Sequence, residues 1–253
     1  RAVSVPIRLR EQEVFLTASV GIASARESGP TPEDLLRDAA VALYEAKRRG
    51  KDSAELFRPT MRDDRNELVT LESDLRRAVE RGEIEVHYQP IARLSDMDLA
   101  GFEALVRWRH PSLGLLGPER FLKVAEQAGL IKDLGRHVMI ESGRQLGIWQ
   151  RAFRPTQPLF VSVNVSSSQL VGSSLVEDVQ TILARESIIR DTFKVEVTES
   201  VVMENPELAA QILDRLKLLG VGLSCDDFGT GYSSLSNLRR LPFDTLKIDR
   251  AFL

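Results

Sequence analysis

Short apolar runs alternate with segments of helical periodicity from residue 84 onward, and this alternation constrains the fold most. Predicted strands cover 84–89, 98–107, 159–165, 193–198, 221–227 and 243–249. Predicted helices cover 118–128, 131–152, 167–186, 206–219 and 233–240. Strands that alternate with helices indicate right-handed β-α-β units and a parallel sheet. We therefore predict an α/β fold, either an open doubly wound sheet or a (β/α)8 barrel that is short of elements at its C-terminus.

The N-terminal part of the chain lacks this regular alternation. Its predicted elements are a hairpin of the runs 2–9 and 14–22, a helix that follows Thr31 and ends before Gly50, and a strand at 54–57. Residues 60–67 are strongly polar, so we place a domain boundary there, followed by a helix that ends at Gly82. The chain is therefore predicted to contain two domains.

Composition argues against several classes of protein. The 253 residues carry 34 basic and 37 acidic side chains, a net charge of −3, which argues against binding to a nucleic-acid polymer. Cys225 is the only cysteine, so no internal disulfide can form, and this fits a reducing compartment such as the cytoplasm. We see no long apolar run and no signal peptide, so we expect no membrane contact by these residues, although missing upstream domains of a parent protein could anchor it.

Polar side chains lie near the C-terminal ends of five successive predicted strands. They are Glu103 with Arg107, Asn164, Glu196 with Glu199, Asp226 with Asp227, and Lys247 with Asp249. In parallel α/β folds the active site forms at this edge of the sheet, so we expect these groups to meet. The adjacent Asp226 and Asp227 repel each other, and removing both from water is costly unless a cation compensates their charge.

Most of these residues also have a purely structural interpretation. Glu103 could pair with Arg107 on one strand face, and Asn164 could cap the following helix. The paired aspartates could also serve as a helix cap, and Lys247 could lie at a solvated strand edge. Glu196 is harder to explain in this way, because both of its neighbours are valine. A shared site is favoured, since the structural interpretations require five coincidences at equivalent positions.

Carboxylate and amide oxygens without histidine or cysteine indicate Mg²⁺ or Mn²⁺ rather than zinc. The three histidines, His87, His110 and His137, show no metal-ligand spacing and are expected to be structural or exposed. Metals of this kind polarise phosphoryl oxygens and lower the pKa of a bound water, which suits hydrolysis of a phosphate ester. Lys247 could then neutralise the phosphate or hold the attacking water, and Arg107 could bind a phosphate oxygen.

The same residues lie in a set of motifs that resembles the EAL domain, the bacterial cyclic di-GMP phosphodiesterase family. The matching segments are Tyr88-Gln89-Pro90-Ile91, Glu103-Ala104-Leu105-Val106-Arg107-Trp108, Asn164-Val165-Ser166, Glu196-Val197-Thr198-Glu199-Ser200, the loop 226–235 and Lys247-Ile248-Asp249. Each short motif is weak alone, but the ordered set over about residues 68–253 is highly specific. The resemblance implies a TIM-like (β/α)8 barrel that hydrolyses one phosphodiester bond of cyclic di-GMP to give linear pGpG. It also implies a homodimer formed through the EAL domain.

The resemblance assigns roles to individual residues. Two Mg²⁺ or Mn²⁺ ions are implied, the first of them bound by Glu103, Asn164, Glu196 and Asp226. Asp227 would help to hold the second metal, Lys247 would contact the catalytic water, and Glu199 would anchor the loop 226–235. The residues implied to line the cyclic di-GMP site are Gln89, Leu105 and Arg107.

The N-terminal part resembles the C-terminal end of a GGDEF (diguanylate cyclase) domain. The matching segments are Leu16-Thr17-Ala18-Ser19-Val20-Gly21-Ile22-Ala23 and Ala42-Leu43-Tyr44-Glu45-Ala46-Lys47-Arg48-Arg49-Gly50-Lys51-Asp52. The signature Gly-Gly-Asp-Glu-Phe does not occur in this sequence, so cyclase activity is not assigned to these residues. The implied domains are a partial α+β GGDEF domain at 1–59, a linker with the first helix at 60–82, and an EAL domain at 83–253.

The resemblance is incomplete after Lys247-Ile248-Asp249. The family continues with two further β-α units that carry another metal-site glutamate, in an Ala-Glu-Gly-Val-Glu stretch, and a later glutamine. We therefore expect the chain to be a fragment of a longer parent, with an incomplete barrel and impaired hydrolysis by itself. Two alternatives stay open: a non-catalytic cyclic di-GMP receptor or dimerising regulatory module, and an unrelated α/β metal hydrolase.

Overall fold

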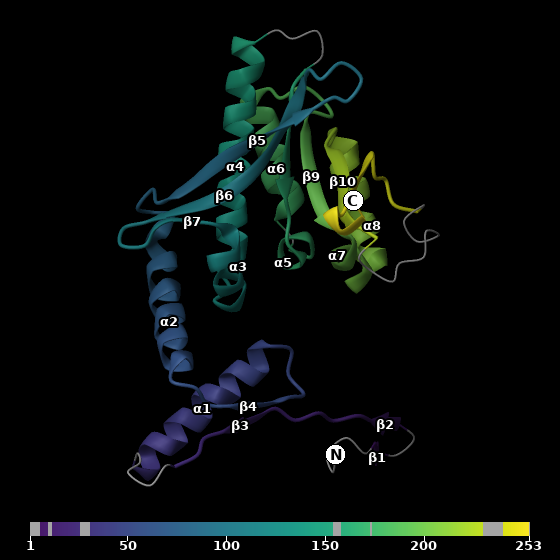
Figure 1. The fold of residues 1–253 in the computed structure, drawn as a ribbon. Helices are drawn as coiled ribbons and strands as arrows, with labels where there is room; N and C mark the ends of the chain where they lie inside the picture. The colour runs from purple at the N-terminus through teal and green to yellow at the C-terminus, as the bar shows by residue number, and fades with distance from the viewer. Residues whose placement is uncertain are drawn as a thin grey trace. The chain divides into compact units, whose positions relative to one another are not determined.

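The computed structural model describes residues 6–9, 12–25, 31–153, 158–172, 174–229 and 240–252 (Figure 1). Its contacts divide the chain into two compact units, Arg1–Ser73 and Asp74–Leu253. In the described ranges, no helix combines the length and the apolar character needed to cross a membrane. The predicted α/β class is confirmed, because the larger unit contains parallel strands and the described helices connect four of them.

The first unit contains two separate pairs of short strands. Strands β1 (Ile7–Leu9) and β2 (Gln12–Val14) form an antiparallel hairpin, whereas β3 (Val20–Ile22) pairs in parallel with β4 (Ala54–Leu56). Helix α1 (Pro32–Arg48) supplies the crossover that a parallel pair requires. The single strand predicted over 14–22 was therefore wrong, since its two ends belong to different sheets. The first residues of the run 2–9 lie outside the described ranges.

Helix α2 (Thr60–Ala78) passes through the polar segment where we predicted a linker. The helix begins at Thr60, about two turns earlier than expected. No glycine or proline interrupts residues 60–78, and the segment contains four arginines, three leucines and two glutamates, which favour a helix. A polar composition alone was therefore the wrong signal for a break in the helix.

The second unit is built on a seven-stranded sheet with the order β11-β10-β9-β8-β6-β5 and β7 beside β6. The strands are β5 (Ile84–Ala92), β6 (Leu99–His110), β7 (Gly114–Leu116), β8 (Phe160–Asn164), β9 (Phe193–Thr198), β10 (Gly222–Phe228) and β11 (Thr245–Ile248). From β6 to β11 along the main path all neighbours are parallel, whereas β5 and β7 run antiparallel to β6. The parallel arrangement predicted from residue 84 onward fails at β5, because the link 93–98 is too short for a crossover.

Helices connect the successive parallel strands from β6 to β10. They are α3 (Pro118–Gln127), α4 (Ile131–Ala152), α5 (Ser167–Leu170), α6 (Leu175–Glu186), α7 (Glu199–Glu204) and α8 (Pro206–Leu219), with a 3-10 turn at Arg250–Phe252. The helix predicted over 167–186 is two helices, which separate around Gly172. Neither β7 nor α7 was predicted, and nearly all of the helix predicted at 233–240 lies outside the described residues.

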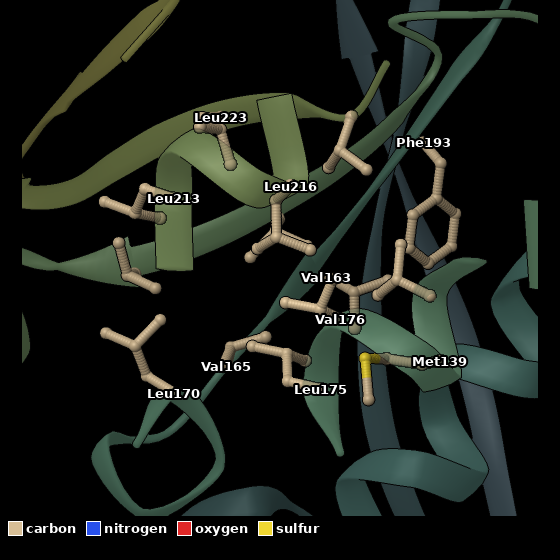
Figure 2. Close-up of a cluster of buried hydrophobic side chains, with 14 of the residues drawn as sticks. Met139, Val163, Val165, Leu170, Leu175, Val176, Phe193, Leu213, Leu216 and Leu223 are labelled. Carbon is tan, nitrogen blue, oxygen red and sulfur yellow. The ribbon is translucent and has the colours of Figure 1, made fainter. Parts of the chain in front are cut away.

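The helix-covered face of the sheet carries the core. Val161 and Val163 of β8, and Val165 directly after it, occupy alternate positions and are buried against residues from α4, α6 and α8. Figure 2 shows Met139, Leu175, Val176, Leu213 and Leu216 in this cluster with Phe193 and Leu223 of the neighbouring strands. Burial of each aliphatic side chain stabilises the fold by about 1.5–3 kcal/mol. Because strand residues alternate between faces, this packing holds the intervening polar residues on the opposite face.

Candidate metal and substrate site

The ammonium group of Lys247 lies at the centre of a polar cluster that five adjacent strands form. Its Nζ donates to Glu196 Oε2 at 2.7 Å, to Asp226 Oδ2 at 3.0 Å and to Glu103 Oε2 at 3.1 Å. One oxygen of each carboxylate lies within 4.8 Å of the others. Asn164, at the end of β8, donates from Nδ2 to Glu103 Oε1 at 3.0 Å. The structure thus brings together residues from β6, β8, β9, β10 and β11.

The structural interpretations of these residues do not agree with the contacts. Glu103 bonds to Asn164 and Lys247, whereas the Arg107 guanidinium donates to the backbone oxygen of Val106 at 2.8 Å. The residue that caps α5 is Ser166, in a capping box, and not Asn164. Lys247 is not a solvated edge residue, because its side chain is only 28% exposed and has three carboxylate partners.

The cluster is short of positive charge. Three carboxylates and one ammonium give 1 − 3 = −2. Burial raises the pKa of Glu196, and the hydrogen bond from Lys247 only partly opposes this effect. Burial alone would lower the pKa of Lys247, but its hydrogen bond and charge interaction with Glu196, together with Glu103 and Asp226, raise it instead. One ammonium is therefore shared among more anions than it can neutralise.

Asp227 lies beside this cluster in an unusual backbone conformation. Its φ of 53° is in the left-handed region, and the β10–β11 register shifts between Cys225 and Phe228. Its backbone N–H donates to Asp226 Oδ1 at 3.0 Å. Burial, followed by the charges of Asp226 and Asp249, raises the pKa of Asp227. Asp227 is not one of the three carboxylates around Lys247. Together with Asp249 it forms a second pair of acidic groups next to them.

Glu199 is a buried carboxylate that holds the start of the loop after β10. It is the first residue of α7, whose cap is Thr198, and only 2% of it is exposed. Its Oε2 accepts a hydrogen bond from the backbone N–H of Gly229 at 2.9 Å. Gly229 has a φ of +99°, and a Cβ there would lie 2.7 Å from the ring of Phe252. The start of the loop is thus fixed, while residues 230–235 of the loop lie outside the described ranges.

The residues implied to bind substrate continue along the same face of β5 and β6. Gln89 pairs in register with Glu103, and Leu105 and Arg107 follow Glu103 at alternate positions. The other face of this hairpin packs against the core through residues such as Tyr88 and Ala104. The wall that leads away from the acidic cluster therefore carries Gln89, Leu105 and Arg107 on the side opposite to the helices.

The donor set fits a hard divalent cation. Mg²⁺ and Mn²⁺ prefer oxygen ligands, with Mg²⁺ at about 2.1 Å, so carboxylate oxygens within 4.8 Å of one another need only small movements to bind one. A flip of the Asn164 amide would present its oxygen to the same point, since the two amide atoms are interchangeable by rotation. A cation would compete with the Lys247 ammonium for the same oxygens. The histidines do not belong to this set; His110, for example, is buried and contacts Asp74 Oδ2 through Nε2 at 3.3 Å.

Two buried serines on the polar face were missed in the sequence. Ser162 pairs in register with Glu103, and Ser224 pairs with Glu196. Both are almost fully buried. Counting back two residues from Asn164 and from Asp226 would have placed them on this face.

Comparison with protein families decides the classification. The family described as "EAL domain" matches residues 72–253. The chain belongs to the EAL domain family. A second family, "Diguanylate cyclase, GGDEF domain", matches residues 1–53.

Several relatives of this EAL protein have been described. The cyclic di-GMP phosphodiesterase NbdA of Pseudomonas aeruginosa is 41% identical over 98% of this chain and 31% of its own length. The bifunctional diguanylate cyclase/cyclic di-GMP phosphodiesterase MucR of the same organism is 39% identical over the whole chain and 37% of its own length. The chain thus spans about a third of the length of these relatives.

Solved EAL structures share the fold. The PaMucR phosphodiesterase in complex with c-di-GMP is 43% identical, with a TM-score of 0.69 over 72% of this chain and 73% of that one. The EAL enzyme Bd1971, in a form bound to cAMP and cyclic di-GMP, is 27% identical, with a TM-score of 0.69 over 89% and 59% of the two chains. EAL domains are TIM-like barrels and depend on metals, and this EAL domain contains both the parallel strands and an acidic cluster.

Proposed function

We propose that the protein hydrolyses cyclic di-GMP to linear pGpG with the help of two Mg²⁺ or Mn²⁺ ions. The observation that carries this proposal is the convergence of Glu103, Glu196 and Asp226 on one ammonium, which leaves the cluster two positive charges short. One divalent cation would restore neutrality. The names of NbdA and MucR, and the c-di-GMP complex of PaMucR, support the choice of substrate.

In this proposal the acidic cluster holds the first metal. Its ligands are Glu103, Asn164, Glu196 and Asp226, and Asp227 helps to hold the second metal. Bound cations of this kind would polarise the phosphoryl oxygens and acidify a water molecule. Lys247, whose ammonium lies among the same carboxylates, would position that water.

Gln89, Leu105 and Arg107 hold the cyclic dinucleotide along the wall of β5 and β6. Arg107 suits a phosphate oxygen, because a guanidinium offers several donors in one plane. Glu199 keeps the loop after β10 in place through Gly229, so that Asp226 and Asp227 stay directed at the metals. The chain thus supplies ligands from strand ends, a wall for the substrate and an anchored loop.

The domain organisation completes the proposal. Residues 1–59 form part of a GGDEF domain, residues 60–82 are the linker and first helix, and residues 83–253 are the EAL domain, whose family match already begins at residue 72 within that helix. We further propose that the EAL domain forms a homodimer and that the protein acts in the cytoplasm. Light scattering on the whole protein that contains this sequence tests the dimer directly.

Turnover is the decisive experiment for the function. The whole protein that contains this sequence is incubated with cyclic di-GMP and Mg²⁺ or Mn²⁺, and pGpG is quantified. We expect pGpG well above the level of a Glu103→Ala control. Calorimetric binding of cyclic di-GMP without any turnover would instead favour a non-catalytic receptor, and neither binding nor turnover would contradict both functions.

A further inference from the structure

His87 lies within the row of residues that faces the proposed substrate. Along the antiparallel β5–β6 pair, Gln89 is opposite Glu103, His87 is opposite Leu105, and residue 85 is opposite residue 107. Side chains directly opposite each other have Cβ atoms about 5 Å apart and point to the same face. His87 is therefore one step further along the wall than Gln89, next to Leu105 and on the same side.

A carboxylate orients the His87 ring. Its Nε2 lies 3.3 Å from Glu85 Oε2, and Glu85 also accepts from Arg109 Nε at 2.5 Å and from Nη2 at 3.0 Å. The hydrogen bond from Arg109, and then that from His87, lowers the pKa of Glu85, so this acceptor stays ionised. A carboxylate at Nε2 favours the tautomer with its proton on Nε2, which leaves Nδ1 as an acceptor.

The Nδ1 atom of His87 has no hydrogen-bond partner within the described part of the chain. The side chain is 45% exposed, so a ligand that lies along the wall can reach it. Stability does not account for this arrangement, because exposed ion pairs contribute about 1 kcal/mol or less. The buried face of β5, which includes Val86 and Tyr88, already holds the strand against the core.

We propose that His87 is a further substrate-binding residue whose Nδ1 accepts a hydrogen bond from the nucleoside part of the cyclic dinucleotide. The donors available there are the guanine N–H groups and the ribose hydroxyl. Glu85 and Arg109 are positioning residues for the ring. This inference rests on the proposed function, because it takes a cyclic dinucleotide as the ligand.

Two variants of His87 test the contact. In His87→Phe a flat ring remains but the acceptor is lost, whereas in His87→Asn the amide oxygen takes the approximate place of Nδ1. In the whole protein with a chelator present, calorimetry should show cyclic di-GMP binding about 3- to 10-fold weaker for His87→Phe, the equivalent of one hydrogen bond. The affinity of His87→Asn for cyclic di-GMP should stay within about threefold of that of the natural protein, a smaller change than the loss of one hydrogen bond produces. With Mg²⁺, KM should rise for His87→Phe while kcat stays nearly constant.

The positioning pair has a matched control. Glu85→Gln should weaken binding, since it frees the ring, whereas Glu141→Gln should not. Glu141 forms a similar exposed ion pair with Arg144 on α4 and is 35% exposed, against 31% for Glu85. A 2′-deoxy analogue of cyclic di-GMP separates the two donors. If the ribose hydroxyl makes the contact, His87→Phe and the natural protein should bind the analogue equally well. If a guanine N–H makes it, His87→Phe should still bind the analogue more weakly, and either result supports the inference.

The outcomes separate this inference from the proposed function. If the natural protein binds and hydrolyses cyclic di-GMP and His87→Phe does so equally well, only the role of His87 is overturned. Equal losses in His87→Asn and His87→Phe would overturn the role of Nδ1 as the acceptor. If the natural protein neither binds nor hydrolyses the substrate, the proposed function fails and this inference fails with it.

Discussion

Each unit of the molecule contains a cluster of carboxylates, but the two clusters differ in their balance of charge. In the first unit, Glu45 bonds to Arg48 and Arg49, and Glu55 pairs with Arg49 and Arg58. Two carboxylates thus face three guanidinium groups, 3 − 2 = +1. In the second unit three carboxylates share the single ammonium of Lys247, and the sum is −2.

The difference affects the carboxylates themselves. The hydrogen bond from Arg48 lowers the pKa of Glu45 although the group is partly buried. Burial raises the pKa of Glu196 in spite of its hydrogen bond to Lys247. The first cluster is thus satisfied by its own protein partners, as expected of a structural network, whereas the second has, among the described residues, one ammonium for three carboxylates. We take this deficit as the property that distinguishes a metal site from an ordinary ion-pair network.

The largest expected effect is on turnover. Glu196→Gln should lower pGpG formation about 100-fold or more, because changes even outside the ligand shell typically cost 10- to 100-fold. The melting temperature of the metal-free protein should not fall, since the change removes a buried charge that lacks full compensation. The matched change Glu45→Gln should leave turnover intact and lower the melting temperature. Equal turnover in the two variants would remove the distinction between the clusters.

The next largest effect concerns the shared cation. In chelator, Lys247→Met should destabilise the protein by about 2 kcal/mol, below the value for a fully buried pair because the side chain is partly exposed. Arg48→Met is the control, since Arg48 is similarly exposed and Arg49 remains to pair with Glu45. Chemical denaturation should show a clearly smaller loss of unfolding free energy for Arg48→Met than for Lys247→Met. A larger loss for Arg48→Met would show that the first cluster depends on its cations more than the second.

Cation binding should stabilise only the second cluster. Mn²⁺ at a fixed concentration, ten times its Kd for the natural protein, should add about 1.4 kcal/mol to the stability of the folded natural protein. Differential scanning calorimetry should show the shift in the natural protein and in Glu45→Gln, but not in Glu196→Gln. The shift should be larger in Lys247→Met, where no ammonium competes for the oxygens. An identical shift in all four proteins would place the binding of the ion elsewhere.

The smallest expected effect is an opposite dependence on pH. A lowered pKa means that Glu45 stabilises the fold above the unfolded pKa of about 4.3 and that this contribution is lost as pH falls through the folded value. A raised pKa means that Glu196 destabilises the fold above its folded value, and that this penalty disappears as pH falls below the unfolded value. The variants Glu45→Gln and Glu196→Gln can be unfolded by denaturant in chelator at pH values from 7 to 3. At pH 7 the free energy of unfolding should be lower than that of the natural protein for Glu45→Gln and higher for Glu196→Gln. Both differences should shrink as the pH falls. Convergence from the same side would contradict the opposite pKa shifts.

Much of the fold follows from periodicity in the sequence. The strand ends at Asn164, Asp226 and Lys247 could be located because apolar runs stop there and because parallel strands present these ends at one edge. The antiparallel direction of β5 was missed, although the short link 93–98 excludes a crossover. The start of α2 was missed because polarity was given more weight than the absence of glycine and proline.

The details of the site depend on geometry that alternation does not encode. Simple alternation places Asp226 and Asp227 on opposite faces, but the register shift and the left-handed φ of Asp227 change this relation. The ammonium of Lys247 reaches three strands because its side chain is long and flexible, and its position depends on the contacts available. Glu199 was expected just past a strand, yet it begins a helix that Thr198 caps, and this helix start directs its carboxylate to Gly229.

Titration calorimetry of Mn²⁺ into the metal-free protein tests the central claim most directly. The charge deficit of the second cluster predicts saturable binding by the natural protein and by Glu45→Gln, and its loss in Glu196→Gln. Binding that is equally strong in Glu196→Gln, or absent from the natural protein, would contradict the assignment of the cluster around Lys247 as a metal site.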